Sequence, residues 1–368
     1  MASAEPSSGG FNPVRVLVPG TGTRFRCGGL SVALQTARLL SSLRPTQLVT
    51  YRERSDRHPH LEDLLRDEQA PGTALWIVSW GFDVPRSLVR LHGRPVVYQA
   101  HSSGYGFNLP PGVPVVAVSR NTLGYWGDRA PRNPLFLVPN ALESQWLERG
   151  ARQGSAHASA VEDRPIDVLV QRRKSSPYVL DRLVPALQAR GLRVEVQSGW
   201  VDDLVDLFND SKVYLYDSAE YWRGRGVSEG FGLPPLEALA CGCVLFSSFN
   251  HALADSLSPG VTAHQIGQGS LENDLARVSE AVASPQQWRP EPLMIEALLE
   301  EYSESRWCER WSRVLSQLDD LAAHGALGLS SQRLLRSPST RQLRWSQRWD
   351  RLRGKVANRL SGWPWRTS

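Results

Sequence analysis

The sequence predicts an α/β protein of two doubly wound, Rossmann-like domains that face each other across a central cleft. Three observations support this fold class. The chain has 368 residues, which is more than most single cores accommodate. Short apolar runs alternate with helical patterns, the order that yields parallel sheets covered by helices. The alternation fails once, over residues 148–165, where small polar residues are typical of a linker.

The first half, residues 1–147, is the predicted amino-terminal domain. Its helical patterns cover residues 29–43 and 83–93, with Asp83 as the expected cap at the start of the second helix and Gly93 at its end. Its apolar runs predict strands buried on both faces. These are VRVLV (14–18), LWIVS (75–79), PVVYQ (95–99), PVVAV (114–118) and LFLV (135–138).

The second half repeats the pattern and is the predicted carboxy-terminal Rossmann-like domain, residues 166–299. Expected strands are residues 166–170, 193–197, 213–217 and 244–248, and expected helices are residues 179–190, 202–210 and 234–241. A helical segment, residues 300–323, is expected to return toward the first domain. A basic, Trp-rich tail, residues 324–368, follows it.

Charge and cysteine content narrow the function classes. From Gln332 onward the chain has ten Arg and Lys against one Asp, which leaves 32 basic against 36 acidic residues in the body. An acidic body argues against nucleic-acid binding. Four sparse cysteines without a CxxC pair indicate reduced thiols in a cytoplasmic protein. We expect neither secretion through a signal peptide nor a membrane-spanning segment.

The segment VSEGFGLPPLEALACGC, residues 227–243, carries the strongest functional signal. It places Glu229 on a loop after a strand and Glu237 in the first turn of a proline-led helix. Ligands bind at this edge of a parallel sheet, so both carboxylates are candidate site residues. For Glu237 alone, a favourable interaction with the helix dipole is an equally good explanation.

This segment closely resembles the nucleotide-sugar signature of retaining glycosyltransferases of family 4 and their relatives, which have the GT-B fold. Those enzymes carry a glutamate, seven residues and a second glutamate, matched here by Glu229 and Glu237. VLVPGTGTRFRCGGL, VVAVSR and VPNAL resemble further family segments in the family's order. The resemblance implies hexosyl transfer from a nucleoside-diphosphate sugar to an unidentified acceptor (a glycan, lipid or small molecule), with no cofactor.

The resemblance also implies residue roles. Glu229 would contact the donor sugar near the reacting carbon, and Glu237 would hold the ribose hydroxyls. Arg173 and Lys174 match the family's phosphate-binding pair, although here they are adjacent, and a solvated basic turn is the alternative. Positive charge there suits a leaving phosphate that gains negative charge. The donor would also lie against the loop residues Gly230, Phe231, Gly232 and Leu233.

The first domain supplies three more candidates. Gly28 and Gly29 resemble the family's glycine loop near the donor phosphates, with a plain turn as the alternative. His101 resembles the cleft histidine near the transferred sugar, with a structural histidine bonded to a carbonyl as the alternative. SGW, residues 198–200, resembles the loop that borders the base. The chain has no DxD triplet, so we expect transfer without a divalent metal.

Two other functions fit parts of this pattern. A glycoside hydrolase also uses paired carboxylates, but it has no need of Arg173 and Lys174 beside a nucleotide cleft. A non-catalytic sugar-nucleotide-binding protein of the same fold would keep the same binding residues. The insertion EYWRGRGV, residues 220–227, departs from the family pattern and bears on the donor sugar and the acceptor.

The tail, residues 337–368, lies outside the resemblance. An apolar stripe with helical spacing runs through it, surrounded by arginines. This pattern is typical of a helix on an anionic bilayer and favours peripheral attachment at the inner face of the membrane. The alternatives are packing on the body of the protein or on a partner, and disorder until the tail binds. The stripe consists of Trp345, Trp349, Leu352, Val356 and Leu360.

Overall fold

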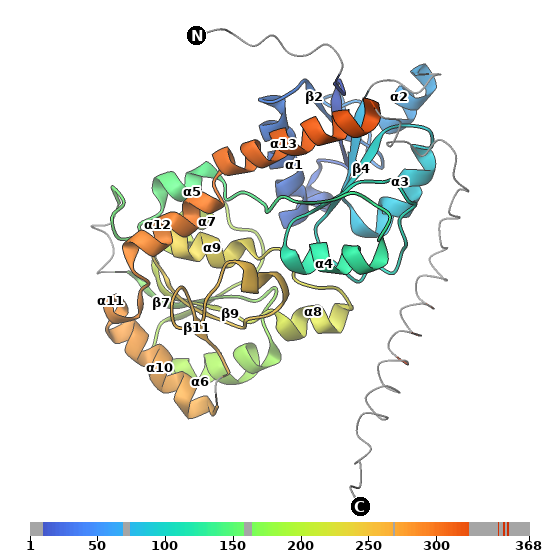
Figure 1. Ribbon diagram of the computed structural model, residues 1–368. Helices are drawn as coiled ribbons and strands as arrows, with labels where there is room; N and C mark the ends of the chain where they lie inside the picture. The colour runs from blue at the N-terminus through green and yellow to red at the C-terminus, as the bar shows by residue number, and fades with distance from the viewer. Residues whose placement is uncertain are drawn as a thin grey trace, which may run out of the picture.

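The computed structural model describes residues 10–68, 74–157, 164–267 and 269–323, together with Trp345, Trp349 and Leu352. The described chain forms two α/β lobes, each built on a parallel sheet flanked by helices (Figure 1). One sheet has the strand order β2-β1-β3-β4-β5-β6 and the other has the order β11-β10-β9-β7-β8. The predicted fold class of two doubly wound domains is therefore confirmed.

The first sheet is buried at its centre and partly exposed at its edges. Strands β1, β3, β4 and β5 are buried along their whole length because helices cover both faces. Edge strand β6 is half-buried, which corrects the prediction of burial on both faces, and edge strand β2 was not predicted. The strands are β1 (Val14–Val18), β2 (Thr46–Thr50), β3 (Leu75–Val78), β4 (Val96–Ala100), β5 (Val115–Ala117) and β6 (Leu135–Leu137).

The second predicted helix of this lobe, α3, begins where the sequence indicates and ends earlier. Asp83 occupies the N-cap position of α3, but its side chain makes no capping hydrogen bond, because its carboxylate accepts a hydrogen bond from Tyr51 (2.6 Å) and pairs with Arg52 (2.5 Å). The helix ends at Arg90, before Gly93. The elements are η1 (Thr23–Phe25), α1 (Gly28–Ser41), α2 (Leu61–Asp67), η2 (Gly81–Asp83), α3 (Val84–Arg90), α4 (Arg120–Arg129) and α5 (Ser144–Arg149).

The second lobe differs from the prediction around the glutamate motif. A helix, α8 (Ala219–Arg225), occupies part of the predicted loop, and Gly226, which follows it, has a left-handed backbone (φ 70°). Helix α9 begins at Leu233, so Glu237 lies in its second turn. The dipole effect is confined to the first turn, so it does not account for Glu237.

The elements of the second lobe are β7 (Ile166–Gln171), η4 (Val179–Leu183), α6 (Val184–Ala189), β8 (Val194–Gln197), α7 (Leu204–Asn209), β9 (Ser211–Tyr216), α8 (Ala219–Arg225), α9 (Leu233–Ala240), β10 (Val244–Ser247), η5 (His251–Asp255), β11 (His264–Gln265), α10 (Leu271–Ala283) and α11 (Pro285–Trp288). Their apolar faces form two clusters, one on each side of the sheet. The short strand β11 extends the sheet beyond the four strands expected from the sequence.

The last two described helices connect the lobes. Helix α12 (Pro292–Glu301) lies against α9, and α13 (Glu304–Ala323) crosses to the first lobe and runs beside α1 (Figure 1). Trp307 and Trp311 are buried there in the cluster that contains β1. Asp319 accepts a hydrogen bond from the Phe11 amide (3.0 Å) and pairs with Arg44. Among the residues that the structure describes, no helix combines the length and apolarity needed to cross a membrane.

Candidate active site

Glu229 lies at the centre of a buried polar cluster between the lobes. Its side chain is almost fully buried, with 3% exposed. Oε2 accepts hydrogen bonds from the Tyr216 hydroxyl (2.5 Å) and the Trp222 indole Nε1 (2.7 Å). The Lys174 ammonium lies 3.4 Å from Oε1. One carboxylate oxygen is therefore occupied by two donors, and the other faces a single lysine.

The electrostatics of the cluster keep Glu229 ionised. Burial by itself would raise the pKa of Glu229, but the Lys174 charge and the hydrogen bonds from Tyr216 and Trp222 outweigh it and hold that pKa below its usual range. Burial, with the neighbouring carboxylate, raises the pKa of Tyr216 well above its ordinary value, so Tyr216 stays a hydrogen-bond donor. Glu229 therefore carries a fixed negative charge, and its hydrogen-bond donors Tyr216 and Trp222 are already in place.

Lys174 reaches Glu229 through an unusual backbone conformation. It follows β7 with a φ of 68°, a left-handed value that is uncommon outside glycine and costs about 1–3 kcal/mol. Its ammonium lies 5.3 Å from the centre of the Trp222 ring as well as beside Glu229. The neighbouring side chain of Arg173 is exposed. The structure therefore brings Lys174, and not Arg173, to the glutamate.

Glu237 lies one turn into α9 and is half-buried. Burial raises its pKa to about 8; nearby Lys174 lowers it and Glu143 raises it further. Across the described part of the chain, no hydrogen bond to its carboxylate is seen, in contrast to Glu229. The two glutamates of the motif therefore differ in charge state near neutral pH.

This raised pKa makes the stability of the protein depend on pH. The folded state keeps the Glu237 proton up to about pH 8, whereas the unfolded state loses it near the ordinary value of 4.5. The free energy of unfolding should therefore fall between these two values as pH rises, a change that Glu237→Gln removes. We expect Glu237→Gln to gain at least about 1 kcal/mol over the wild type at pH 8 relative to pH 5.

Urea unfolding at both pH values measures this difference, with exposed Glu220→Gln as the control. An equal difference between Glu237→Gln and the wild type at pH 5 and pH 8 would contradict the raised pKa.

The loop after Glu229 is shaped by two glycines and an anchoring aromatic. Gly232 has a φ of 90° and precedes α9, a conformation that favours glycine. A Cβ on Gly230 would lie 1.5 Å from the His101 carbonyl oxygen, so only glycine fits there. Phe231 is buried against Tyr302, with ring centres 5.3 Å apart, and Leu233 packs on the same core. The loop is therefore held in place by its contacts with His101, Tyr302 and the core.

His101 directly follows β4 on the opposite lobe. Its Nε2 atom is buried and has no hydrogen-bond partner among the described residues. Burial lowers the pKa of His101 to about 4, so the imidazole is neutral at physiological pH. Nε2 therefore keeps an unused hydrogen-bonding site.

The glycines of the first loop open onto free space. They start α1, and a Cβ on Gly28 would meet no atom within 4 Å, while one on Gly29 would meet only the Cys27 sulfur at 3.7 Å. Packing within the protein therefore does not require glycine at either position. Just before them, the Arg26 guanidinium lies 5.3 Å from the ring of Trp200 on the second lobe. This contact links the two lobes at the predicted base-bordering loop.

Tyr216 and Trp222 were not predicted as site residues. Tyr216 is the last residue of β9, and Trp222 belongs to α8, within the insertion that departs from the family pattern. The available signals were an aromatic residue at a strand's carboxyl end and a tryptophan seven residues before Glu229. Neither pattern specifies a hydrogen bond to a carboxylate.

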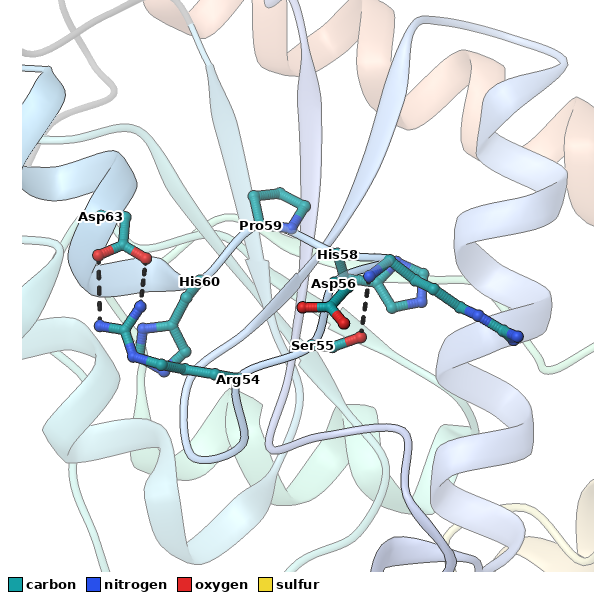
Figure 2. A pocket seen from close by; sticks show the side chains of 8 residues that line it. Arg54, Ser55, Asp56, His58, Pro59, His60 and Asp63 are labelled. Carbon is teal, nitrogen blue, oxygen red and sulfur yellow. Dashed lines mark hydrogen bonds and ion pairs between the residues drawn. The ribbon is translucent and has the colours of Figure 1, made fainter.

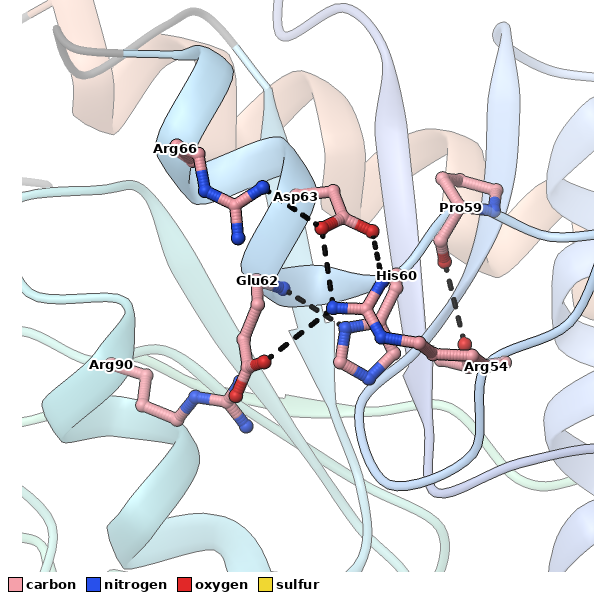
Figure 3. Close-up of polar contacts among 8 residues, drawn as sticks. Arg54, Pro59, His60, Glu62, Asp63, Arg66 and Arg90 are labelled. Carbon is pink, nitrogen blue, oxygen red and sulfur yellow. Dashed lines mark hydrogen bonds and ion pairs between the residues drawn. The ribbon is translucent and has the colours of Figure 1, made fainter.

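A separate pocket of about 560 Å³ lies on the first lobe (Figure 2). It is lined by the loop that leaves β2 at Thr50 and returns beside it at His60. Arg54 is held by Asp63 and lies near Glu62, which also accepts a hydrogen bond from Arg90 (3.2 Å; Figure 3). Of the charged residues that line the pocket, Arg54 and Asp63 thus form an ion pair with each other. No sequence pattern singled it out.

Comparisons with known proteins identify the fold. No family model matches the chain, and no curated protein matches its sequence. A glycosyltransferase from Rickettsia africae is similar in structure, with 9% identity, a TM-score of 0.58 and coverage of 83% of this chain and 98% of that one. Sucrose-phosphate synthase from Thermosynechococcus elongatus has 14% identity, a TM-score of 0.59 and coverage of 84% and 99%. Anabaena HepE in complex with UDP has 13% identity, a TM-score of 0.56 and coverage of 83% of this chain and 99% of that one.

At these identities the comparisons establish the fold alone. Two parallel-sheet lobes that match glycosyltransferases over nearly their whole length define a GT-B fold. The GT-B prediction is therefore confirmed.

Proposed function

We propose that this protein is a retaining glycosyltransferase of the family 4 type that moves a hexosyl group from a nucleoside-diphosphate sugar to an acceptor without a metal. The carrying observation is the Glu229 carboxylate, which is held ionised by Tyr216, Trp222 and Lys174 in the cleft of a GT-B fold. HepE has been crystallised with UDP and with UDP-glucose, so uridine donors are the first to test.

The proposed roles follow from charge. The donor's diphosphate gains negative charge as it leaves, and Lys174 supplies a positive charge beside it. The anomeric carbon becomes cation-like, and the ionised Glu229 is placed to stabilise it. Neutral His101 has a free Nε2 for a sugar hydroxyl. Glu237 is assigned to the ribose hydroxyls, because the neutral carboxylic acid that its raised pKa implies can donate one hydrogen bond to a diol and accept another from it.

The test combines binding with chemistry. Thermal shifts are measured against a panel of nucleotide sugars, since a ligand at 100 times its dissociation constant stabilises by about 2.7 kcal/mol. Release of the nucleoside diphosphate is then followed with and without EDTA, and the anomeric configuration of the product is read by NMR. We expect release that EDTA does not change, with retention. Uniform failure of the panel would overturn the proposal, and binding without release would indicate a non-catalytic sugar-nucleotide-binding protein.

We further propose that the basic tail attaches the protein to an anionic membrane surface. Most of the tail lies outside the described residues, but Trp345, Trp349 and Leu352 are helical, spaced four and three apart, and 60%, 56% and 52% exposed. These spacings put the three side chains on one helix face. The surrounding arginines would each add about 1 kcal/mol near anionic lipid.

Vesicle sedimentation tests the attachment. The full chain is expected to sediment with anionic and not with neutral vesicles, and high salt should release it. Truncation before Ser337 should abolish sedimentation and spare donor binding. Sedimentation of the truncated chain would place the membrane contact elsewhere.

A further inference from the structure

Ser228, the residue before Glu229, joins the two lobes through a hydrogen-bonded cluster that we call the Ser228 clasp. Its hydroxyl oxygen lies 2.7 Å from the Ser103 hydroxyl, 3.3 Å from the Ser103 amide and 3.2 Å from the Asn121 amide nitrogen. Its carbonyl accepts a hydrogen bond from Ser102 (2.7 Å). Three polar groups of the first lobe therefore converge on the single hydroxyl oxygen of Ser228.

The clasp members come from different lobes. Ser102 and Ser103 follow β4, and Asn121 lies in the first turn of α4, all on the first lobe. Ser228 lies on the second lobe, on the loop between α8 and α9, and is 5% exposed. The clasp therefore exists only when the lobes are in contact.

The clasp fixes the backbone on both sides of Glu229. Ser228 is bonded to the first lobe, and Gly230 lies directly under the His101 carbonyl, where no Cβ would fit. The same loops also meet at Gly104, where a Cβ would lie 2.3 Å from the Gly226 carbonyl oxygen. Contact between the lobes thus holds the positions immediately before and after the glutamate.

We propose that Ser228 is a positioning residue that makes the placement of Glu229 depend on closure of the two lobes. This inference rests on the proposed function for its kinetic consequences. When the lobes separate, the residues on either side of Glu229 lose their contacts with the first lobe, and His101 moves away from the glutamate. Closure restores the contacts beside Glu229 and the position of His101, so Glu229 and His101 come together only in the closed cleft.

Kinetics of matched variants test the proposal. Ser228→Ala and Ser103→Ala are each expected to lower kcat about 10- to 100-fold with donor KM nearly unchanged, because Lys174 and Glu237 still bind the donor. The double variant should be little worse than either single variant, since both remove the same contact. Ser279→Ala is the control, because its buried hydroxyl has no partner among the described residues and lies on α10. If the effects of the two substitutions multiply in the double variant, or if the single variants leave kcat unchanged, the positioning role is wrong.

Small-angle scattering without donor tests the clasp independently of any chemistry. Gly230→Ala cannot close, because its Cβ would overlap the His101 carbonyl. We expect a larger radius of gyration for Gly230→Ala and Ser228→Ala than for the wild type and Ser279→Ala. A wild-type radius equal to that of Gly230→Ala would show that the clasp does not form in solution and would overturn the proposal. This result holds whether or not the protein proves to be a transferase.

Discussion

Glu229→Gln is expected to lower turnover by about a thousandfold or more while changing donor affinity only a few-fold. Glutamine has the same shape, and its carbonyl can still accept hydrogen bonds from Tyr216 and Trp222. It carries no charge, however, and its NH₂ group would face the Lys174 ammonium, where Oε1 now lies. The loss therefore falls on the transition state, where the cation-like sugar needs the negative charge.

Steady-state kinetics with a saturating donor measure this effect, and unfolding curves check that the variant is folded. Glu237→Gln is the paired comparison, because it should raise donor KM more than it lowers kcat. Glu220→Gln, which removes an exposed carboxylate paired with Arg223 on α8, should leave both parameters unchanged. Equal and small effects at Glu229 and Glu237 would remove the basis for the two assigned roles.

The central strands of both sheets could be predicted because they are buried on both faces and read as continuous apolar runs. Strand β2, with the sequence TQLVT, could not, because an edge strand is half-exposed and its polar residues hide the pattern. Helix α8 was missed for a related reason. It buries none of its residues fully, so AEYWRGR shows no apolar face.

Part of the candidate site is marked in the sequence by residue types and their spacing, which do not depend on a particular backbone conformation. The spacing of Glu229 and Glu237 is visible in the sequence, and so is the basic turn after β7. The choice of Lys174 over Arg173 depends on a left-handed backbone that sequence patterns do not specify for lysine. The hydrogen bond from Trp222 depends on α8, which was not predicted.

A buried arginine in the predicted linker also escaped the sequence analysis. Arg164 is 1% exposed. Its guanidinium donates to the carbonyls of Ser211 (2.5 Å), Ala151 (3.1 Å) and Cys241 (2.8 Å). These carbonyls belong to the start of β9, the segment after α5 and the end of α9, so one side chain fastens three segments behind the glutamate motif. An arginine among small polar residues gives no hint of such burial.

Arg164→Met is expected to lower the free energy of unfolding by about 3 kcal/mol, the largest stability loss that we predict for a single residue. Methionine has a similar length but no donors, so three buried carbonyls would lose the hydrogen bonds that the guanidinium donates. Removing a buried charge offsets part of this cost, which keeps the expected loss from being larger.

Urea unfolding followed by circular dichroism measures the loss, with exposed Arg190→Met as the control, expected to stay within about 0.5 kcal/mol of the wild type. Arg164→Lys separates charge from geometry, because its single ammonium keeps the charge but cannot span three carbonyls as a planar guanidinium does. We expect Arg164→Lys to be nearly as unstable as Arg164→Met. Wild-type stability in Arg164→Lys would mean that charge alone holds these segments, and wild-type stability in Arg164→Met would mean that their carbonyls need no donor.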